Sequence, residues 1–214
     1  MKFKLLISLI FVCVISSSYG QKSKKGLFSP TKFGIQFIQG NENSFLFNDP
    51  DYFYRSNTLK GQFYYPFTKW KPMAISLILQ PQLQFIQHQL YNEHFVKPTE
   101  DDYLEKRKRY TQLKNLSIFA VALGLEAKKQ VFKSTSIFFQ IGLGLGYVDM
   151  TTERLAKGFT FTQNGNLGLD IKVTPTASIQ IFGGIGHVSN ANIQLPNSGY
   201  NMFNTGVGFL YNIK

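Results

Sequence analysis

The chain has 214 residues, of which 43% are hydrophobic and 15% aromatic, and its formal net charge is +11. This length suits one domain with a sizeable core. A single cysteine, Cys13, excludes an intramolecular disulfide framework, and no apolar run beyond the first twenty residues approaches the ~20 residues that a membrane-spanning helix needs.

The N-terminal segment has the pattern of a secretory signal peptide, because Lys2 and Lys4 precede an apolar run over residues 5–15. We expect residues 1–20 to be removed, which leaves a single domain over residues 21–214. Loss of the two lysines lowers the formal charge from +11 to +9, and a charge of this sign favours an anionic partner. Because the protein is exported, we expect that partner to be a lipid or a glycan and no nucleic acid to be bound.

The rest of the chain alternates apolar and polar residues with a period of two, in segments separated by Gly, Pro, Asn and Lys clusters. Odd-numbered positions carry the apolar residues in eight segments, at about 33–37, 59–67, 75–85, 119–125, 137–147, 159–171, 179–185 and 203–213. An even number of amphipathic strands is typical of bacterial outer-membrane barrels. We therefore expect an all-β fold, an eight-stranded antiparallel outer-membrane β-barrel whose odd-numbered residues face lipid.

The even-numbered positions carry uncharged amides and glycines, whereas a soluble sandwich would expose a charge-rich face to water. Gln36, Gln62, Gln140, Asn166 and Gln180 are examples. Eight strands leave an interior just wide enough for side chains, so we expect these amides to bond to one another in a filled lumen. A porin channel is excluded by the same argument.

The connections fall into a shorter set, at residues 68–72, 127–136 and 172–176, and a longer set, at 41–55, 88–115, 149–158 and 189–200. Bacterial barrels place short turns in the periplasm and longer loops outside, so we expect the longer set to be external. We expect aromatic residues at both interfaces, with Phe67 and Trp70 at one rim and Tyr147, Phe159 and Tyr200 at the other.

Polar residues interrupt the lipid-facing pattern near the last long loop. His187 and Ser189 share the odd register of Ile185, and Asn201 at the start of the last segment is also odd-numbered. Polar groups on a lipid-facing wall cost free energy unless they have a function. Side chains at positions i and i+2 of a strand lie roughly 6.5–7 Å apart on one face, so an imidazole can reach toward a serine oxygen. The pattern indicates a serine nucleophile with a histidine base.

These residues carry a family resemblance. The run His187-Val188-Ser189-Asn190-Ala191, followed by Pro196-Asn197-Ser198-Gly199, resembles the signature of PagL-type lipid A 3-O-deacylases. The resemblance implies an eight-stranded barrel in the cell outer membrane that hydrolyses the ester-linked acyl chain at position 3 of lipid A in lipopolysaccharide. It implies that neither a metal nor a cofactor takes part.

On the matching positions, the resemblance implies that Ser189 is the nucleophile and His187 its general base, while the Asn197 side chain and the Asn192 backbone N–H bind the oxyanion. The family has a glutamate where this chain has Asn201. An amide can hold the tautomer of the histidine but does not supply the negative charge that stabilises an imidazolium. Glu42, in the first long loop, is an alternative source of the acid.

The longest loop carries the basic run Lys106, Arg107, Lys108 and Arg109, which is either a solvated surface or a site for the phosphates of lipid A. His88 and His94 are six residues apart in a polar loop, where we expect them to be solvated and not to bind metal. The alternative to an esterase is a non-enzymatic small barrel for adhesion, lipid binding or membrane stabilisation. The sequence leaves open a homodimer and the length of the acyl chain.

Overall fold

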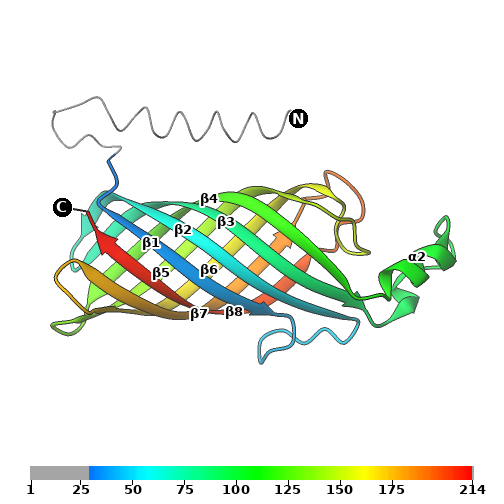
Figure 1. The fold of residues 1–214 in the computed structure, drawn as a ribbon, viewed down its shortest axis with the longest axis horizontal. Helices are drawn as coiled ribbons and strands as arrows, with labels where there is room; N and C mark the ends of the chain where they lie inside the picture. The colour runs from blue at the N-terminus through cyan, green and yellow to red at the C-terminus, as the bar shows by residue number, and fades with distance from the viewer. Residues whose placement is uncertain (1–28, 214) are drawn as a thin grey trace.

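A computed structural model describes residues 29–213, so the expected signal peptide lies outside the described residues. Eight antiparallel strands form one closed barrel in which β1 pairs with both β2 and β8 (Figure 1). The strands are β1 (Lys32–Asn41), β2 (Tyr52–Trp70), β3 (Met73–Leu90), β4 (Lys114–Gln130), β5 (Thr135–Val148), β6 (Gly158–Lys172), β7 (Ala177–Ser189) and β8 (Tyr200–Asn212). The predicted strand number, order and fold class are confirmed.

The outer wall is formed by the odd-numbered side chains, as the alternation predicts. Leu123 and Leu143 pair across β4 and β5 and are 59% and 53% exposed, whereas the even-numbered Ala122 is buried. Successive strand residues point to opposite faces, so the wall is apolar because the odd positions are apolar. An apolar outer wall of this kind is typical of an outer-membrane barrel, in which lipid covers the exposed leucines and phenylalanines.

The lumen is filled by side chains that hydrogen-bond to one another. Gln36 Nε2 donates to Gln180 Oε1 at 2.9 Å, and Gln140 Nε2 donates to Glu126 Oε2 at 2.7 Å. The expectation of amide pairing is therefore confirmed, but the lumen is not free of charge. Glu126 and Asp170 are each 1% exposed inside the barrel. Both residues are at even-numbered, inward-facing positions, and the sequence analysis did not predict acidic residues among the amides there.

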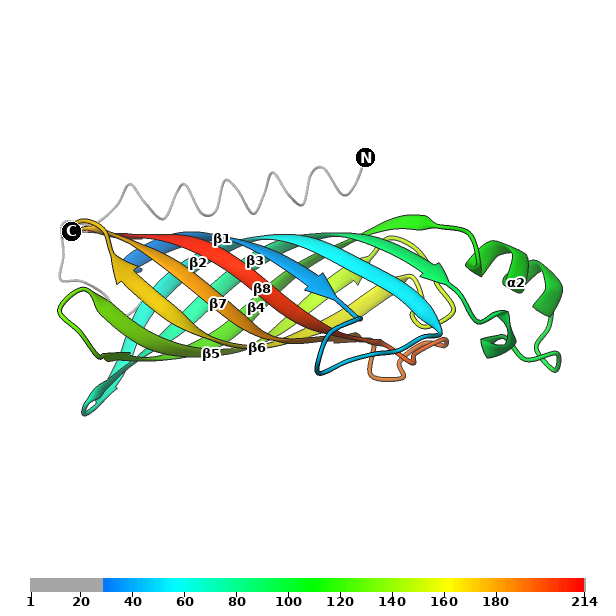
Figure 2. The same ribbon diagram turned by 90° about the horizontal axis from the view of Figure 1, so that it is seen from below.

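The long loops gather at one end of the barrel and the short turns at the other (Figures 1 and 2). At the long-loop end, the connection between β3 and β4 contains the 3₁₀ helix η1 (Glu93–Phe95) and the helix α2 (Tyr103–Tyr110), which extends beyond the strands. Among residues 29–213, no helix is long and apolar enough to cross a membrane.

Two predictions at the long-loop end are wrong: that Tyr200 lies at the membrane interface and that His88 is solvated. Tyr200 is 1% exposed and stacks on Tyr54 inside the barrel, because its even-numbered position points inward. His88 is also fully buried at the end of β3, where its Nε2 lies 2.7 Å from Glu153. Both side chains close the mouth of the lumen. By contrast, Phe67, Trp70, Tyr147 and Phe159 are exposed at their expected rims, and His94 is exposed.

Candidate active site

His187 and Asn201 form the centre of the site. They are direct partners in the register between β7 and β8, and His187 Nδ1 donates to Asn201 Oδ1 at 2.7 Å. An amide oxygen can only accept, so this bond keeps the proton on Nδ1 and leaves Nε2 with a free lone pair. His187 is thus held in the tautomer that a general base requires.

Ser189 ends β7 two residues beyond His187, on the same outward face. Both side chains are partly exposed, and Ser189 lies one step closer to the long-loop end than His187. Within the described part of the chain, no hydrogen bond joins His187 Nε2 to Ser189 Oγ. Catalytic hydrogen bonds are often long without substrate, so this geometry is compatible with a serine nucleophile and a histidine base.

Gly199 covers this pair from the last long loop. Its φ of +67° lies in the left-handed region, and a Cβ at this position would lie 3.1 Å from His187 Cε1 and 3.4 Å from Ser189 Cβ. The same Cβ would lie only 2.7 Å from the Val188 carbonyl oxygen. Only glycine allows the loop backbone to approach the imidazole and the serine together.

The loop between β7 and β8 is folded by three asparagines. Asn197 Oδ1 accepts the Asn190 backbone N–H at 2.7 Å, and Asn197 Nδ2 donates to Asn192 Oδ1 at 3.1 Å. The first bond fixes the amide so that Nδ2 faces away from the strand, with one of its two hydrogens left for another acceptor. Asn192 itself has a φ of +61°, which asparagine tolerates better than most residues.

Arg154, in the loop between β5 and β6, holds Gly199 in position. Arg154 Nε donates to the Gly199 carbonyl at 3.0 Å, and the Arg154 carbonyl accepts the N–H groups of Ser198 and Gly199 at 2.8 and 3.0 Å. Its guanidinium also pairs with Asp49 at 3.3 Å and lies over the Tyr52 ring at 4.3 Å. Three loops therefore meet at one arginine behind the candidate nucleophile.

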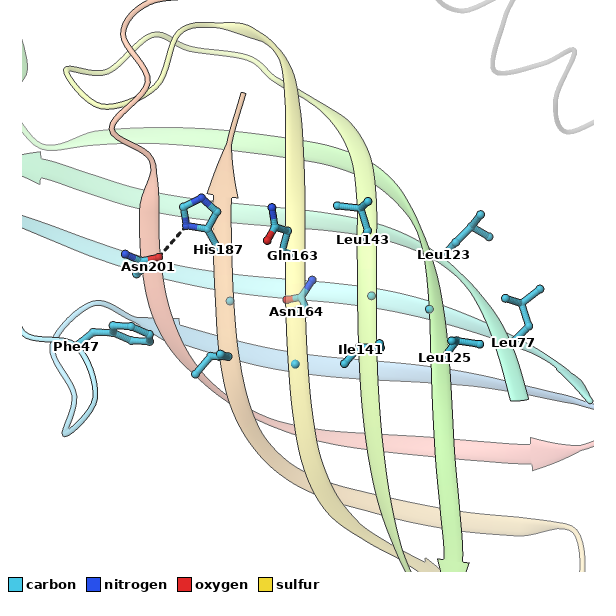
Figure 3. Close-up of a pocket in the computed structure, with 15 residues that line it drawn as sticks. Phe47, Leu77, Leu123, Leu125, Ile141, Leu143, Gln163, Asn164, His187 and Asn201 are labelled. Atoms are coloured by element: carbon cyan, nitrogen blue, oxygen red, sulfur yellow. Dashed lines mark hydrogen bonds between the residues drawn. The ribbon is translucent and has the colours of Figure 1, made fainter. Parts of the chain in front are cut away.

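A groove of about 710 Å³ in the outer wall begins at His187 and Asn201 (Figure 3). We call it the wall groove. Ten of its fifteen lining residues form two rows of register partners that cross the strands. The upper row is Asn201, His187, Gln163, Leu143 and Leu123; the lower row is Ile185, Gly165, Ile141, Leu125 and Leu77.

The lower row is notched at Gly165, where the wall lacks a side chain between Ile141 and Ile185. A Cβ placed there would have only Ile185 Cγ1 within 4 Å, at 3.7 Å. Phe47, from the loop between β1 and β2, adds an aromatic side to the groove. The wall groove is therefore an apolar channel that starts at polar residues and runs across the lipid-facing surface.

The sequence of this chain matches the model of one known protein family. The family model described as Lipid A 3-O-deacylase (PagL) matches residues 85–209, more than half of the chain. The chain belongs to the PagL family. The match runs from within β3 into β8 and includes His187, Ser189, Asn197 and Asn201. Phe47 and Leu77 of the wall groove and Asp49 beside Arg154 lie outside it.

Two solved structures are similar to this chain in fold. The structure of the outer membrane enzyme PagL has a TM-score of 0.52 and 10% sequence identity, and the match covers 84% of this chain and 99% of that chain. Neisserial surface protein A has a TM-score of 0.45 and 10% identity, with 85% and 96% covered. At these identities the likeness concerns the fold alone. Among curated proteins, none matches.

The alternative acid in this PagL family member does not reach the histidine. Glu42 is 5% exposed and points into the mouth of the lumen, beside Tyr54, while His187 lies on the outer wall. Burial raises the pKa of the Glu42 carboxyl, so its position does not favour a charged partner for an imidazolium. The position behind His187 is occupied by Asn201 instead.

The basic run lies on α2, apart from the PagL family motif. Arg107 is committed to its own loop, since its Nε and Nη2 donate to the Val96 carbonyl at 3.1 and 2.9 Å. Lys106 pairs with Glu100 at 3.3 Å, Arg109 lies over the Tyr110 ring at 4.7 Å, and Lys108 is exposed. The helix therefore does not contribute to the wall groove.

Sequence reasoning missed four features of the site: Arg154, Gln163, Gly165 and Phe47. Gln163 and Gly165 had a detectable signal, because both break the apolar pattern at odd positions of β6. Arg154 and Phe47 had none, since they come from loops whose paths depend on distant contacts. In the described range, no cluster of three or more His, Cys, Asp or Glu residues is arranged to hold a metal.

Proposed function

We propose that this protein is an esterase that removes the acyl chain esterified at the 3-O position of lipid A, working from the outer leaflet of the outer membrane. Membership of the PagL family supports the substrate and the bond. The observation that carries the chemistry is the His187–Asn201 pair at the head of the wall groove. The pair faces the lipid side, where an acyl chain is found, and not the lumen.

In the proposed mechanism, Ser189 Oγ attacks the ester carbonyl while His187 Nε2 takes the serine proton. The tetrahedral intermediate collapses to an acyl-serine as His187 returns the proton to the departing sugar hydroxyl. Water then attacks the acyl-serine with the same histidine as base, which releases the fatty acid and restores the serine. Asn201 orients the imidazole throughout through the bond to Nδ1.

The oxyanion is bound by two donors of the loop between β7 and β8. Asn197 Nδ2 retains one hydrogen beyond the bond to Asn192, and the backbone N–H of Asn192 has no partner among the described residues. The same side-chain bond joins Asn192 to Asn197, so the two donors belong to one rigid turn. Preorganised donors of this kind contribute about 10²- to 10³-fold to the rate.

The acyl chain that is to be released occupies the wall groove. From the serine the acyl chain passes His187 and then runs over Gly165 toward the leucines of β4 and β5. This path leaves the sugar headgroup beside the last long loop, at the depth where acyl chains join the glucosamine. The open wall explains how a barrel without an aqueous lumen reaches a membrane substrate.

The proposed function is tested by removing the hydroxyl of Ser189 in one variant and that of Ser198 in another. Ser189→Ala should abolish acyl release while the barrel stays folded, whereas Ser198→Ala, on an exposed neighbour, should leave release unchanged. Mass spectrometry of lipid A from cells producing each variant counts the ester-linked chains, and heat-modified gel mobility reports folding. Acyl loss with Ser189→Ala at the wild-type level would exclude the serine mechanism. No acyl loss with the wild-type protein would favour the non-enzymatic barrel.

A further inference from the structure

The short-turn end of the barrel carries exposed lysines on every one of its three connections. These connections gather at one end of the molecule, opposite α2 and the candidate active site (Figures 1 and 2). We call the exposed lysines of the turns and of the adjoining strand ends the short-turn lysines. They are Lys69 and Lys71 between β2 and β3, Lys129 and Lys133 between β4 and β5, and Lys172 at the end of β6.

The short-turn lysines are not balanced by exposed acids. Glu126 and Asp170 lie in this half of the barrel, but each is 1% exposed because it points into the lumen. Asp170 pairs at 2.7 Å with a different lysine, Lys128. At the long-loop end, by contrast, Lys106 pairs with Glu100 on the surface. The connections and strand ends that carry the short-turn lysines contain no Asp or Glu, over residues 65–76, 127–136 and 171–178.

Aromatic side chains are exposed among the same turns. Phe67, Trp70 and Phe132 are 70%, 71% and 73% exposed. Trp70 has an even number but does not lie in the lumen, because β2 continues past Tyr64, the last of its residues that pairs with β1. The hairpin of β2 and β3 therefore projects from this end of the barrel (Figure 2).

This combination of charge and aromatic surface matches the boundary of a bilayer that contains anionic lipids. Tryptophan and other aromatic rings are favourable at the level of the lipid headgroups. Lysines near the surface are attracted by the negative potential of anionic lipids, over a distance set by the salt concentration. An anionic partner dissolved in water would neutralise the lysines but leave the three rings exposed to water.

We propose that the short-turn lysines bind the phosphate groups of anionic phospholipids in the leaflet opposite the candidate active site, and that this contact holds the β2–β3 hairpin at the membrane surface. A lysine carries its charge on a flexible apolar stem, so it reaches a headgroup from a backbone at the edge of the hydrocarbon. The surface is at the far end of the barrel from His187 and Ser189. The inference therefore does not depend on the proposed esterase activity.

Trp70 provides a local probe, because it is the single tryptophan of the chain. The protein is reconstituted into phosphatidylcholine vesicles that contain either brominated phosphatidylglycerol or brominated phosphatidylcholine, and quenching of Trp70 fluorescence measures which lipid lies beside the hairpin. We expect both lipids to quench Trp70. The binding constant for phosphatidylglycerol relative to phosphatidylcholine should be about threefold to tenfold higher at low salt and approach one at high salt.

The variant that tests the lysines is Lys69→Gln with Lys71→Gln, on either side of Trp70. It should lower the preference for phosphatidylglycerol at least twofold, while both lipids still quench Trp70. Lys97→Gln with Lys157→Gln, two exposed lysines of the long loops, is the matched control and should keep the preference. Heat-modified gel mobility reports whether each variant is folded, and Lys69→Arg with Lys71→Arg should restore the preference.

Three results would overturn the inference. Equal quenching by the two lipids at low salt would show that the wild-type surface does not select anionic headgroups. Trp70 that neither lipid quenches would place the hairpin in water. A preference that is unchanged in the folded Lys69→Gln, Lys71→Gln variant would show that these lysines do not bind the phosphates.

Discussion

At the scale of single residues, the group behind the histidine is the amide of Asn201, where the family resemblance implies a glutamate. Asn201 Oδ1 accepts the His187 Nδ1 proton at 2.7 Å, which fixes the tautomer and the ring orientation. A carboxylate would do the same and would in addition stabilise the imidazolium that forms in the transition state. Asn201 therefore orients the imidazole of His187, but it does not supply the negative charge that would stabilise an imidazolium.

We expect Asn201→Glu to maintain or raise kcat, because it keeps the acceptor and adds the charge. Asn201→Leu, which removes the acceptor at similar volume, should lower kcat by roughly 10²- to 10⁴-fold. Steady-state rates of acyl release measure both. Glu42→Gln is the control for the alternative acid and should leave kcat unchanged, since Glu42 points into the lumen. A large loss with Glu42→Gln would return the acid role to that residue.

A second residue-scale prediction concerns Arg154, which reaches the catalytic pair only through Gly199. Arg154→Ala removes the bond to the Gly199 carbonyl and the pairing with Asp49. Small displacements of catalytic groups are costly, so kcat should fall about tenfold to a hundredfold while KM changes little. Arg154→Lys should restore only part of the rate, because an ammonium lacks the planar fork.

The control for Arg154 is Arg55→Ala, an exposed arginine on β2, which should change neither kcat nor KM. Heat-modified gel mobility of both variants reports the stability of the barrel. If Arg154→Ala raises KM and leaves kcat intact, the arginine contacts the substrate and does not position the loop.

At the scale of elements, the wall groove depends on the register between β5, β6 and β7. Gly165 lies between Ile141 and Ile185 because these three residues are direct partners across the strands. A shift of one residue in any of these ladders would turn the glycine into the lumen. The site is thus a property of three adjacent strands and not of β7 alone.

Gly165→Leu should fill the notch and reduce hydrolysis of long-chain esters by at least tenfold, with a smaller effect on a short-chain ester whose tail does not reach it. The physical reason is that the new side chain occupies the path of the chain at no cost to the barrel, since only Ile185 lies within 4 Å of a Cβ there. Rates over a series of chain lengths measure the effect. Gly183→Leu, an outward position of β7 that does not line the wall groove, is the matched control. An equal loss at every chain length would contradict the proposed path.

At the scale of the whole molecule, the strands form an apolar wall with a filled lumen, and charge collects at the ends. The long-loop end carries α2, with Lys106, Lys108 and Arg109 on or near its surface. In our proposal this end faces the outside, where lipid A carries its phosphates. Arg107 is excluded from such a role because it bonds to the Val96 carbonyl.

Neutralising Lys106, Lys108 and Arg109 to glutamine should weaken association with phosphorylated lipid A more than with a dephosphorylated form, and the difference should shrink as salt rises. Binding to micelles of each lipid at two ionic strengths measures this. Arg107→Gln alone is the contrast, and it should act through the stability of the loop, so that both lipids are affected equally. If the triple variant loses affinity equally for the phosphorylated and the dephosphorylated lipid, α2 does not bind the phosphates and is only a solvated surface.

The sequence by itself determined the barrel, because the direction of a side chain on a strand follows from local backbone geometry that repeats every two residues. That rule predicted eight strands, the lipid-facing wall and the outward direction of His187, Ser189 and Asn201. It also identified the loop from Pro196 to Gly199 through the family motif. It was wrong where an even-numbered residue was assigned outside the lumen, as for Tyr200, or where a strand end was taken for loop, as for His88.

Only the tertiary structure decided how the strands and loops meet. The pairing of His187 with Asn201, the placement of Gln163 beside His187 and the notch at Gly165 depend on register between strands, which sequence alternation leaves free by steps of two residues. The contacts of Arg154 with Gly199 join loops 45 residues apart in the chain, and no local pattern encodes them. Local geometry determined which way each side chain points, and long-range packing determined which of them lie together.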